Sequence, residues 1–170
     1  ALDPKAYRKA VALLAESEFI DIFGVENSLT PAMDLFTKLG YLGLTCRLNT
    51  DAYLQQIGAG HLPHGAVAVA FSHSGSSADT VKALRLAKSH GAKTIAITNA
   101  IGAPLASWAD VTLLTGRDSH TIYGNAIFSR VADTALVDML YMGVILSGYG
   151  RFSTALDESG RMIRDRVFEN

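Results

Sequence analysis

The sequence Ala66-Val67-Ala68-Val69-Ala70-Phe71-Ser72-His73-Ser74-Gly75-Ser76-Ser77 decides the fold of this chain. Its first six residues are all apolar, as in a parallel strand that is buried on both faces. The next six carry four hydroxyl groups and one glycine, and the helical pattern of residues 78–90 follows directly. A buried strand, a hydroxyl-rich turn and a helix start bring N–H groups and hydroxyls to the positive end of a helix dipole. The stretch therefore predicts a parallel sheet with an anion site, of the kind that binds phosphate, at the end of this strand.

The same alternation of strand and helix continues on both sides of this stretch. Further strands are expected at residues 19–23, 44–48, 94–98 and 111–115. Helices are expected at residues 7–15, 30–40, 51–57 and 78–90, with a short helical turn at 104–109. This order predicts an α/β fold of the flavodoxin-like kind. It is a three-layer, doubly wound sandwich in which a five-stranded parallel sheet carries helices on both faces.

The C-terminal part of the chain differs from the rest. The pattern of residues 122–146 predicts a helical segment that is apolar nearly all round, and we expect such a helix to be either central in the fold or shared with a second subunit. Residues 151–170 combine charged positions with one apolar side, which predicts a terminal amphipathic helix. We therefore expect a single domain over residues 1–170, with a leading helix in 1–17 and C-terminal helices in 122–170. The apolar segment also predicts a homodimer or tetramer.

Composition limits the classes of function. The 170 residues are 49% apolar and 18% charged, and 15 basic against 16 acidic residues give a net charge of −1. Because no dense basic run occurs, we do not expect this segment to hold nucleic acid by itself. Cys46 is the single cysteine, so no internal disulfide can form and a cytoplasmic location is expected.

No targeting or membrane segment is expected. The first residues are mixed and polar rather than a signal peptide. The apolar run 131–146 is interrupted by Asp133 and Asp138 and is shorter than the ~20 residues of a membrane span. We therefore expect no membrane partner.

Two loops have suitable residues for a ligand site, because ligands of open α/β sheets lie beyond the carboxyl ends of strands. One is residues 24–28, after the strand 19–23, and the other is residues 72–77. Gly75 permits close approach of the backbone, and Ser77 fits the N-cap of helix 78–90. Ordinary turn and cap residues are the alternative interpretation of these serines. The candidate ligand residues are Asn27, Ser28, Ser72, His73, Ser74, Gly75 and Ser77, with Gly24, Glu26 and His120 as further candidates.

Other kinds of site find little support. Neither G-x-G-x-x-G nor a Gly-Lys-Ser/Thr motif occurs, so neither a dinucleotide site nor a P-loop is predicted, and we expect no cofactor. His61 and His64 flank Leu62-Pro63, but two candidate ligands are too few for a metal site, and none is expected.

The sequence resembles a known family in four segments. Phe71-Ser72-His73-Ser74-Gly75-Ser76-Ser77-Ala78-Asp79-Thr80 and residues 90–99 resemble the sugar isomerase (SIS) domain, a phosphosugar-binding module. Residues 104–111 and 127–133 resemble its regulatory branch, the RpiR-type transcriptional regulators, in which a helix-turn-helix domain precedes the SIS domain. The resemblance extends from about residue 10 to residue 146.

This resemblance implies a role for each loop. Ser72, Ser74 and Ser77 would hold the phosphate, Ser28 would face the ligand, and His73 would contribute its backbone N–H. The chain would then be the effector-binding domain of a regulator and would bind a phosphorylated sugar or sugar acid. Ligand binding would alter the arrangement of a dimer, and with it the DNA binding of a helix-turn-helix domain expected before Ala1. The lack of an initiator Met agrees with the expectation that this chain is part of a longer protein.

An enzyme is the alternative: an aldose–ketose phosphosugar isomerase similar to the arabinose-5-phosphate isomerases. That reaction needs a base to move a proton between neighbouring carbons, for which Glu26 and His120 are the candidates. Many SIS isomerases carry Glu in a Ser-Gly-Glu-Thr sequence where this chain has Ser76. Since we assign no catalytic residue, the residues favour sensing over turnover.

Overall fold

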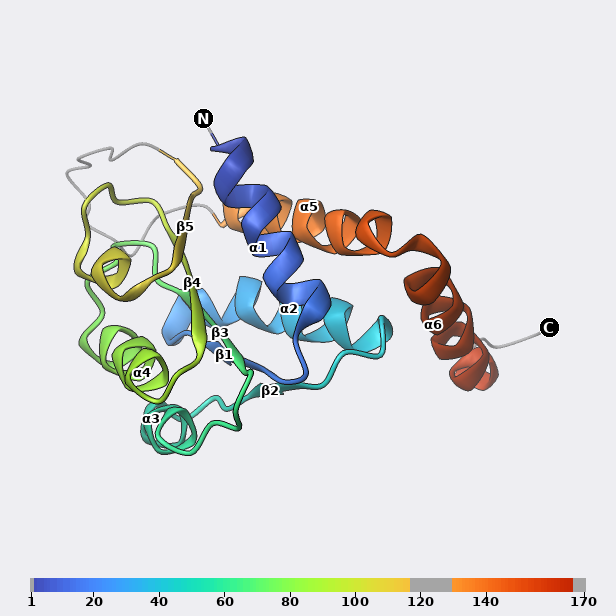
Figure 1. Ribbon diagram of the computed structural model, residues 1–170, viewed down its shortest axis with the longest axis horizontal. Helices are drawn as coiled ribbons and strands as arrows, with labels where there is room; N and C mark the ends of the chain where they lie inside the picture. Colours follow the sequence, from blue (N-terminus) through green and yellow to red (C-terminus); the bar gives the residue numbers. More distant parts are fainter. Residues whose placement is uncertain (1, 117–129, 167–170) are drawn as a thin grey trace.

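Five parallel strands form a single sheet in the order β2-β1-β3-β4-β5. The computed structural model describes residues 2–116 and 130–166 (Figure 1). The strands are β1 (Ile20–Phe23), β2 (Cys46–Leu48), β3 (Val67–Phe71), β4 (Lys93–Thr98) and β5 (Val111–Leu114). The predicted five-stranded parallel sheet is therefore confirmed, and β3 lies at its centre.

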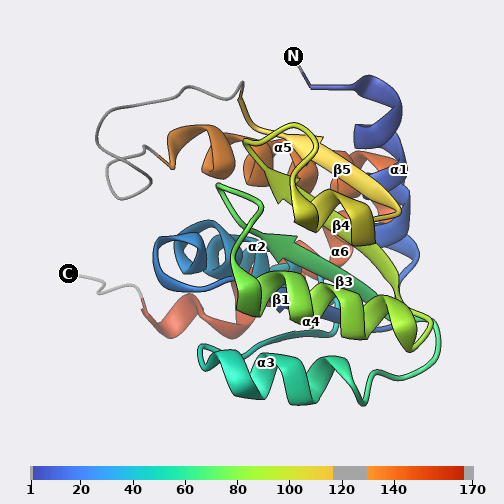
Figure 2. The ribbon, with the colours of Figure 1, turned by 90° about the vertical axis from the view of Figure 1, so that its left-hand side faces the viewer.

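Helices cover both faces of the sheet, as the alternation predicts (Figures 1 and 2). One face packs against α1 (Pro4–Glu16), α2 (Leu29–Tyr41) and α5 (Val131–Ser147). The other face packs against α3 (Ala52–Ala59), α4 (Ala78–Ser89) and a short 3₁₀ helix, Pro104–Trp108. The last helix, α6 (Tyr149–Met162), extends away from the body of the domain. A 3₁₀ turn, Arg164–Arg166, follows it.

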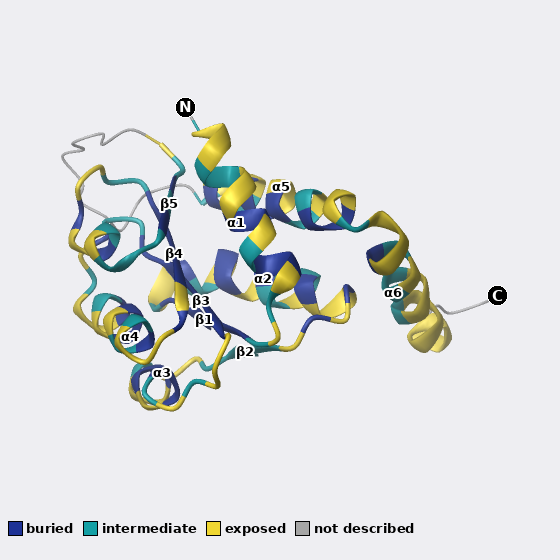
Figure 3. Ribbon diagram, in the orientation of Figure 1, coloured by how far each residue is buried: buried dark blue, intermediate teal, exposed yellow. Residues whose placement is uncertain are grey.

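The two faces of β3 bury side chains of different size. Val67, Val69 and Phe71 belong to the core beneath α1, α2 and α5. The alternating alanines 66, 68 and 70 belong to the smaller core beneath α4. Every residue of β3 is buried (Figure 3). Because alanine has only a methyl side chain, α4 can lie close to the strand, and its first turn comes near the end of β3.

Residues at the ends of α1, α3 and α4 have the roles that their residue types favour. Pro4 occupies the first turn of α1. Asp51 caps α3 by accepting a hydrogen bond of 2.9 Å from the Leu54 N–H. Gly91 follows α4 with φ of +87° and so serves as its C-terminal glycine.

The C-terminal helices differ in extent from the prediction. The helix expected over residues 122–146 is present as α5 from Val131, while residues 122–129 lie outside the described residues. The terminal amphipathic helix begins earlier than expected, directly after a break at Gly148, and ends at Met162. Within the described ranges no single helix has the length and apolar character of a membrane span. Only the pair α5 and α6, bent by 116°, meets those criteria of length and composition.

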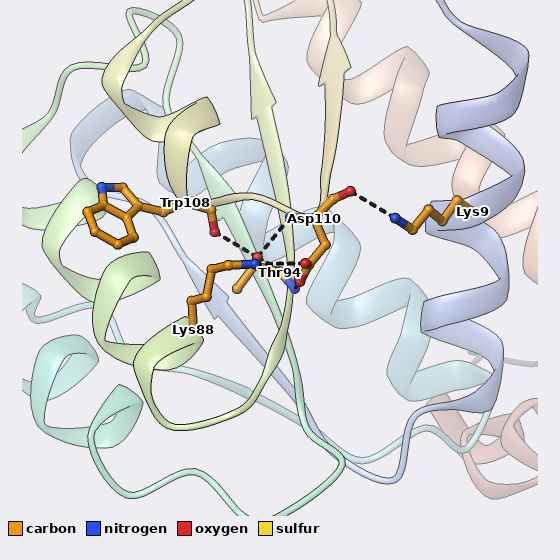
Figure 4. Close-up of polar contacts among 5 residues, drawn as sticks. All are labelled: Lys9, Lys88, Thr94, Trp108 and Asp110. Atoms are coloured by element: carbon orange, nitrogen blue, oxygen red, sulfur yellow. Dashed lines mark hydrogen bonds and ion pairs between the residues drawn. The ribbon is translucent and has the colours of Figure 1, made fainter.

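A polar network at the start of β5 fastens three layers together (Figure 4). The Asp110 carboxylate accepts a hydrogen bond of 2.9 Å from the Thr94 N–H in β4 and pairs with Lys88 Nζ of α4 at 2.7 Å. The Asp110 carbonyl accepts a bond of 3.0 Å from Lys9 Nζ of α1. Burial by itself would raise the pKa of Asp110, but the hydrogen bonds and charge from Lys88 and Thr94 outweigh it and lower that pKa below its usual value.

We expect Asp110→Asn to lower the free energy of unfolding by about 1–2 kcal/mol at pH 7, because the charge-assisted bonds are lost and Lys88 is partly exposed. The pKa of Asp110 is lower in the folded than in the unfolded chain. Its contribution is therefore complete above the unfolded pKa of about 3.9 and is lost as the pH falls through the folded value. Urea unfolding at pH 7 and at pH 3 measures this, with Asp157→Asn on exposed α6 as the control. A difference between wild type and variant that stays the same at both pH values would contradict the assignment.

Candidate functional site

A cavity of about 370 Å³ opens where β1 and β3 end. These strands are neighbours in the sheet, with Phe23 paired to Ala70, so the loops that follow them lie side by side. We call this space the serine cavity. Its lining residues are Val25, Glu26, Asn27, Ser28, Ser72, His73, Ser74, Ser77, Asp79 and Arg130.

The first loop is held in place by a buried side chain of α3. The Gly24 N–H donates to Gln55 Oε1 at 3.2 Å, and Gln55 Nε2 donates to the Gly24 carbonyl at 2.8 Å. The same Nε2 also donates to the Asn49 carbonyl at 2.7 Å. Gly24 does not line the cavity. Its backbone is instead fixed by Gln55, so it positions the residues that follow.

Glu26 is the strained residue of this loop. Its φ of +51° lies in the left-handed region, which residues other than glycine rarely adopt. Glu26 begins a short 3₁₀ helix, Glu26–Ser28, and its exposed side chain lines the serine cavity. Such strain is concentrated at binding and catalytic sites in proteins, because the surrounding structure must enforce it. The structure therefore places an acidic group at the cavity on a backbone that the fold constrains.

The second loop is fastened to the end of β4. The Ser72 N–H donates to the Ile97 carbonyl at 3.1 Å, and the Asn99 N–H donates to the His73 carbonyl at 3.0 Å. Thr98 Oγ1 donates to the same His73 carbonyl at 3.1 Å. Gly75 lies in the turn with φ of +63°, buried beneath the loop rather than in the cavity lining. These bonds fix the shape of residues 72–77, which we call the serine loop, without using the hydroxyl of Ser72.

Ser77 occupies the predicted N-cap position of α4, but the prediction that its side chain caps the helix is wrong. Its hydroxyl makes no capping bond; Ser77 Oγ accepts a hydrogen bond of 3.3 Å from Thr80 Oγ1. The Thr80 hydroxyl reaches back one turn of the helix and engages the oxygen that a cap would use. Because no side chain within the described residues caps α4, the N–H groups of its first turn remain available to an anion.

Two charged residues that the sequence interpretation missed also line the cavity. Asp79 lies in the first turn of α4, where its Oδ1 accepts a bond of 2.9 Å from Gln56 Nε2. Arg130 directly precedes α5, and its Nε and Nη1 atoms are buried without a hydrogen-bond partner in the described part of the chain. The sequence interpretation missed Arg130 because it placed this residue inside the helix expected over residues 122–146, whereas α5 begins at Val131 and Arg130 directly precedes it.

The sequence candidates are thus mostly gathered at one place. Seven of them line the serine cavity: Glu26, Asn27, Ser28, Ser72, His73, Ser74 and Ser77. Gly24 and Gly75 shape the two loops from outside the lining. His120 lies outside the described residues.

Metal and thiol chemistry find no support in the part of the chain that the structure describes. No group of three or more His, Cys, Asp or Glu side chains there could hold a metal ion. Burial raises the pKa of Cys46 to about 12, so its thiol is protonated at neutral pH and is a poor nucleophile.

Comparison with known proteins yields one family match and several relatives. The sequence model of the SIS domain matches residues 13–143. An uncharacterised HTH-type transcriptional regulator of Caldanaerobacter subterraneus is 30% identical over 169 residues, which are 99% of this chain and 60% of that protein. The HTH-type transcriptional regulator RpiR of Escherichia coli K12 is 26% identical over 143 residues, 84% of this chain and 48% of RpiR. The chain therefore spans about half to three fifths of these curated relatives.

A solved structure extends the comparison. The Vibrio vulnificus NanR protein complexed with ManNAc-6P superimposes with a TM-score of 0.91 at 25% sequence identity. The match covers 99% of this chain and 63% of that one.

We expect Gly75→Ala to destabilise the chain by about 2 kcal/mol or more, since a Cβ there would overlap that of Ala103 and lie 2.8 Å from Thr98 Oγ1. Gly102→Ala is the matched control, because Gly102 has a similar φ of +71° but open space around it. The control should cost about 1 kcal/mol, the backbone strain alone. Urea unfolding of both variants measures the difference. Equal losses would show that the serine loop is not tightly seated on β4.

Proposed function

The chain belongs to the SIS domain family, and from this premise we propose that it is the effector-binding part of a transcriptional regulator. The effector is a phosphorylated sugar or sugar acid bound in the serine cavity. The observation that carries this proposal is the uncapped start of α4 facing a cavity lined by serine hydroxyls.

The chemistry of the second loop suits a phosphate. Ser72, Ser74 and Ser77 offer hydroxyl donors, and the first turn of α4 offers N–H groups at the positive end of its dipole. Donors of both kinds surround the oxygens of a phosphate without requiring a metal ion. This arrangement supports the phosphate-binding role that the family resemblance implies for these serines.

The opposite side of the cavity suits the sugar. Glu26, Asn27 and Ser28 offer carboxylate, amide and hydroxyl groups, which can hydrogen-bond to several sugar hydroxyls at once. A volume of about 370 Å³ lies within the usual range for small-molecule sites. The NanR structure that resembles this chain contains ManNAc-6P, which further supports a phosphosugar as the class of ligand.

The regulatory role rests on the relatives. They are HTH-type transcriptional regulators and are longer than this chain. With a net charge of −1 and no dense basic run, the chain itself is not suited to hold DNA. We therefore assign DNA contact to a helix-turn-helix domain on the N-terminal side of Ala1.

Glu26 supports one second candidate function, the aldose–ketose isomerase. It is a carboxylate at the cavity on a strained backbone, and isomerisation needs a base. Ser76, where many SIS isomerases carry glutamate, is exposed and lies outside the cavity lining. Conversion of arabinose 5-phosphate by the purified chain, abolished by Glu26→Gln, would favour the enzyme over the sensor.

A homodimer is the second part of the proposal. α5 exposes Met139, Met142 and Leu146, while α1, α5 and α6 line a largely apolar cavity of about 640 Å³. Exposed apolar side chains on a helix that also lines an apolar cavity are suited to a protein–protein contact. A second copy of the chain, docked through the same helices, would bury it. Effector binding would then act by favouring one arrangement of the two copies, to the extent that its affinity differs between them.

We expect a phosphosugar to bind the wild-type chain and its unphosphorylated parent sugar not to bind. Titration calorimetry with ManNAc-6P, glucose 6-phosphate, arabinose 5-phosphate and 6-phosphogluconate measures this. Ser72→Ala and Ser74→Ala should each weaken binding about tenfold, the effect of one lost hydrogen bond. Ser107→Ala, which removes an exposed hydroxyl in the 3₁₀ helix Pro104–Trp108, is the control. Absence of binding by every compound, or equal binding by the serine variants, would refute the proposal.

We also expect sedimentation at micromolar concentration to give a dimer or larger assembly. Leu146→Glu should shift the chain towards monomer, because it puts a charge into the apolar contact. Glu158→Gln on the exposed part of α6 serves as the control. A strictly monomeric wild-type chain would contradict this part of the proposal.

A further inference from the structure

Arg130 has an unmet requirement for an anion. Among the described residues that line the serine cavity, Arg130 alone carries a permanent positive charge. Its Nε and Nη1 atoms are buried and have no hydrogen-bond partner among the residues that the structure describes, 2–116 and 130–166. Leaving buried donors unsatisfied is unfavourable, and more so when the group is charged. An anion that enters the cavity would remove this cost, so the arginine has a reason to engage the ligand directly.

The backbone of Arg130 is already joined to α5. Its carbonyl accepts the first helical bond, of 3.0 Å, from the Thr134 N–H. Thr134 Oγ1 lies 3.1 Å from the same carbonyl and donates to it as well as towards Val131. Arg130 therefore both lines the serine cavity with its side chain and begins α5 with its backbone, so a change in its backbone position also changes that of the first turn of α5.

The middle of α5 lies against α1, whose side chains contact the α5 backbone (Figures 1 and 2). Tyr7 Oη donates a hydrogen bond of 2.6 Å to the Met139 carbonyl. A Cβ at Gly143 would overlap Tyr7 Oη and lie 2.7 Å from Val11 Cγ2, so these two side chains of α1 pack directly against the backbone of α5. Packed contacts of this kind move as units and do not deform smoothly. A shift of α5 along its axis, which is about 25 Å long, therefore also moves α1.

We propose that Arg130 binds the anionic group of the effector, and that α5 transmits the occupancy of the serine cavity to α1 through the Tyr7–Met139 contact. This inference rests on the proposed function of the cavity and extends it, because it names the residue and the helices that carry the signal. α1 is the helix nearest to the expected helix-turn-helix domain, so its position is the one that an effector must change. An anion that binds the guanidinium would draw both helices into one arrangement.

Binding of inorganic phosphate tests the first half, because it reports anion binding without dependence on the sugar. Arg130→Gln should weaken phosphate binding about 10- to 100-fold, as expected for a lost charge-assisted hydrogen bond. Arg130→Lys keeps the charge and should bind with intermediate affinity. Arg161→Gln, which removes an exposed arginine of α6, should bind as wild type does. Equal phosphate affinity in Arg130→Gln and wild type would overturn the role of Arg130.

Hydrogen exchange followed by mass spectrometry tests the second half. In the wild type, saturating phosphate should slow exchange in three places: the serine loop with the start of α4, the first turn of α5, and α1. Tyr7→Phe removes the hydrogen bond to Met139 and leaves the cavity intact. It should keep the responses of the serine loop and of α5 and lose that of α1.

The outcomes separate the two proposals. If phosphate slows exchange in the serine loop but never in α1 of the wild type, the coupling is refuted while the binding site stands. A Tyr7→Phe chain whose α1 responds as in the wild type refutes the route through Met139. If phosphate leaves the wild-type serine loop unchanged, the proposed function itself fails, and this inference fails with it.

Discussion

β3 lies between β1 and β4 and is buried on both faces, and this burial governs where the site can form. Large side chains on one face fill the core under α1, α2 and α5, while alanines on the other face let α4 pack closely. The buried β3 and the closely packed α4 meet at the carboxyl end of β3. There the chain must turn within a few residues and enter α4, so its N–H groups gather beside the neighbouring loop from β1. The cavity thus follows from the order and direction of the strands rather than from any one loop.

The shape of the site is enforced by residues that do not line it. Gln55 of α3 fixes Gly24 with two hydrogen bonds, and Thr98 and Asn99 at the end of β4 both bond to the His73 carbonyl. Gly75 fits against Ala103 where no larger residue has room. None of these bonds uses a serine hydroxyl of the cavity. Ser74 Oγ accepts from the Ser76 N–H and Ser77 Oγ accepts from Thr80, so both hydroxyls keep their protons to donate to a ligand. A site prepared in this way loses less conformational entropy when the ligand binds.

α5 connects three features that are otherwise separate. Its start carries Arg130 at the serine cavity, its middle contacts α1 through Gly143, and its outer side exposes methionines and a leucine. A helix that is apolar nearly all round is unusual on a protein surface. In α5, one side packs in the core, another contacts α1, and the outer side is free to bind a second copy of the chain. The close approach at Gly143 explains why a glycine is kept within a helix, where it costs about 0.5–1 kcal/mol relative to alanine.

The apolar runs and the loop residues of the sequence predict the sheet, its strands and the place of the candidate site. Apolar runs such as residues 66–71 can be satisfied only by burial on both faces, and the glycine and serine pattern after them marks a turn into a helix. Seven candidates from the two loops line one cavity, because parallel neighbouring strands end at the same edge. Only the tertiary structure decided that Asp79 and Arg130 join them, since a charged residue near a helix start has no local signal that names its partner. It also decided that Ser77 leaves α4 uncapped and that Gly24 and Gly75 support the loops. Ser77 depends on Thr80, Gly24 on Gln55 and Gly75 on Ala103 for these roles. Such contacts form only when folding brings the two residues together, so the sequence pattern alone does not show them.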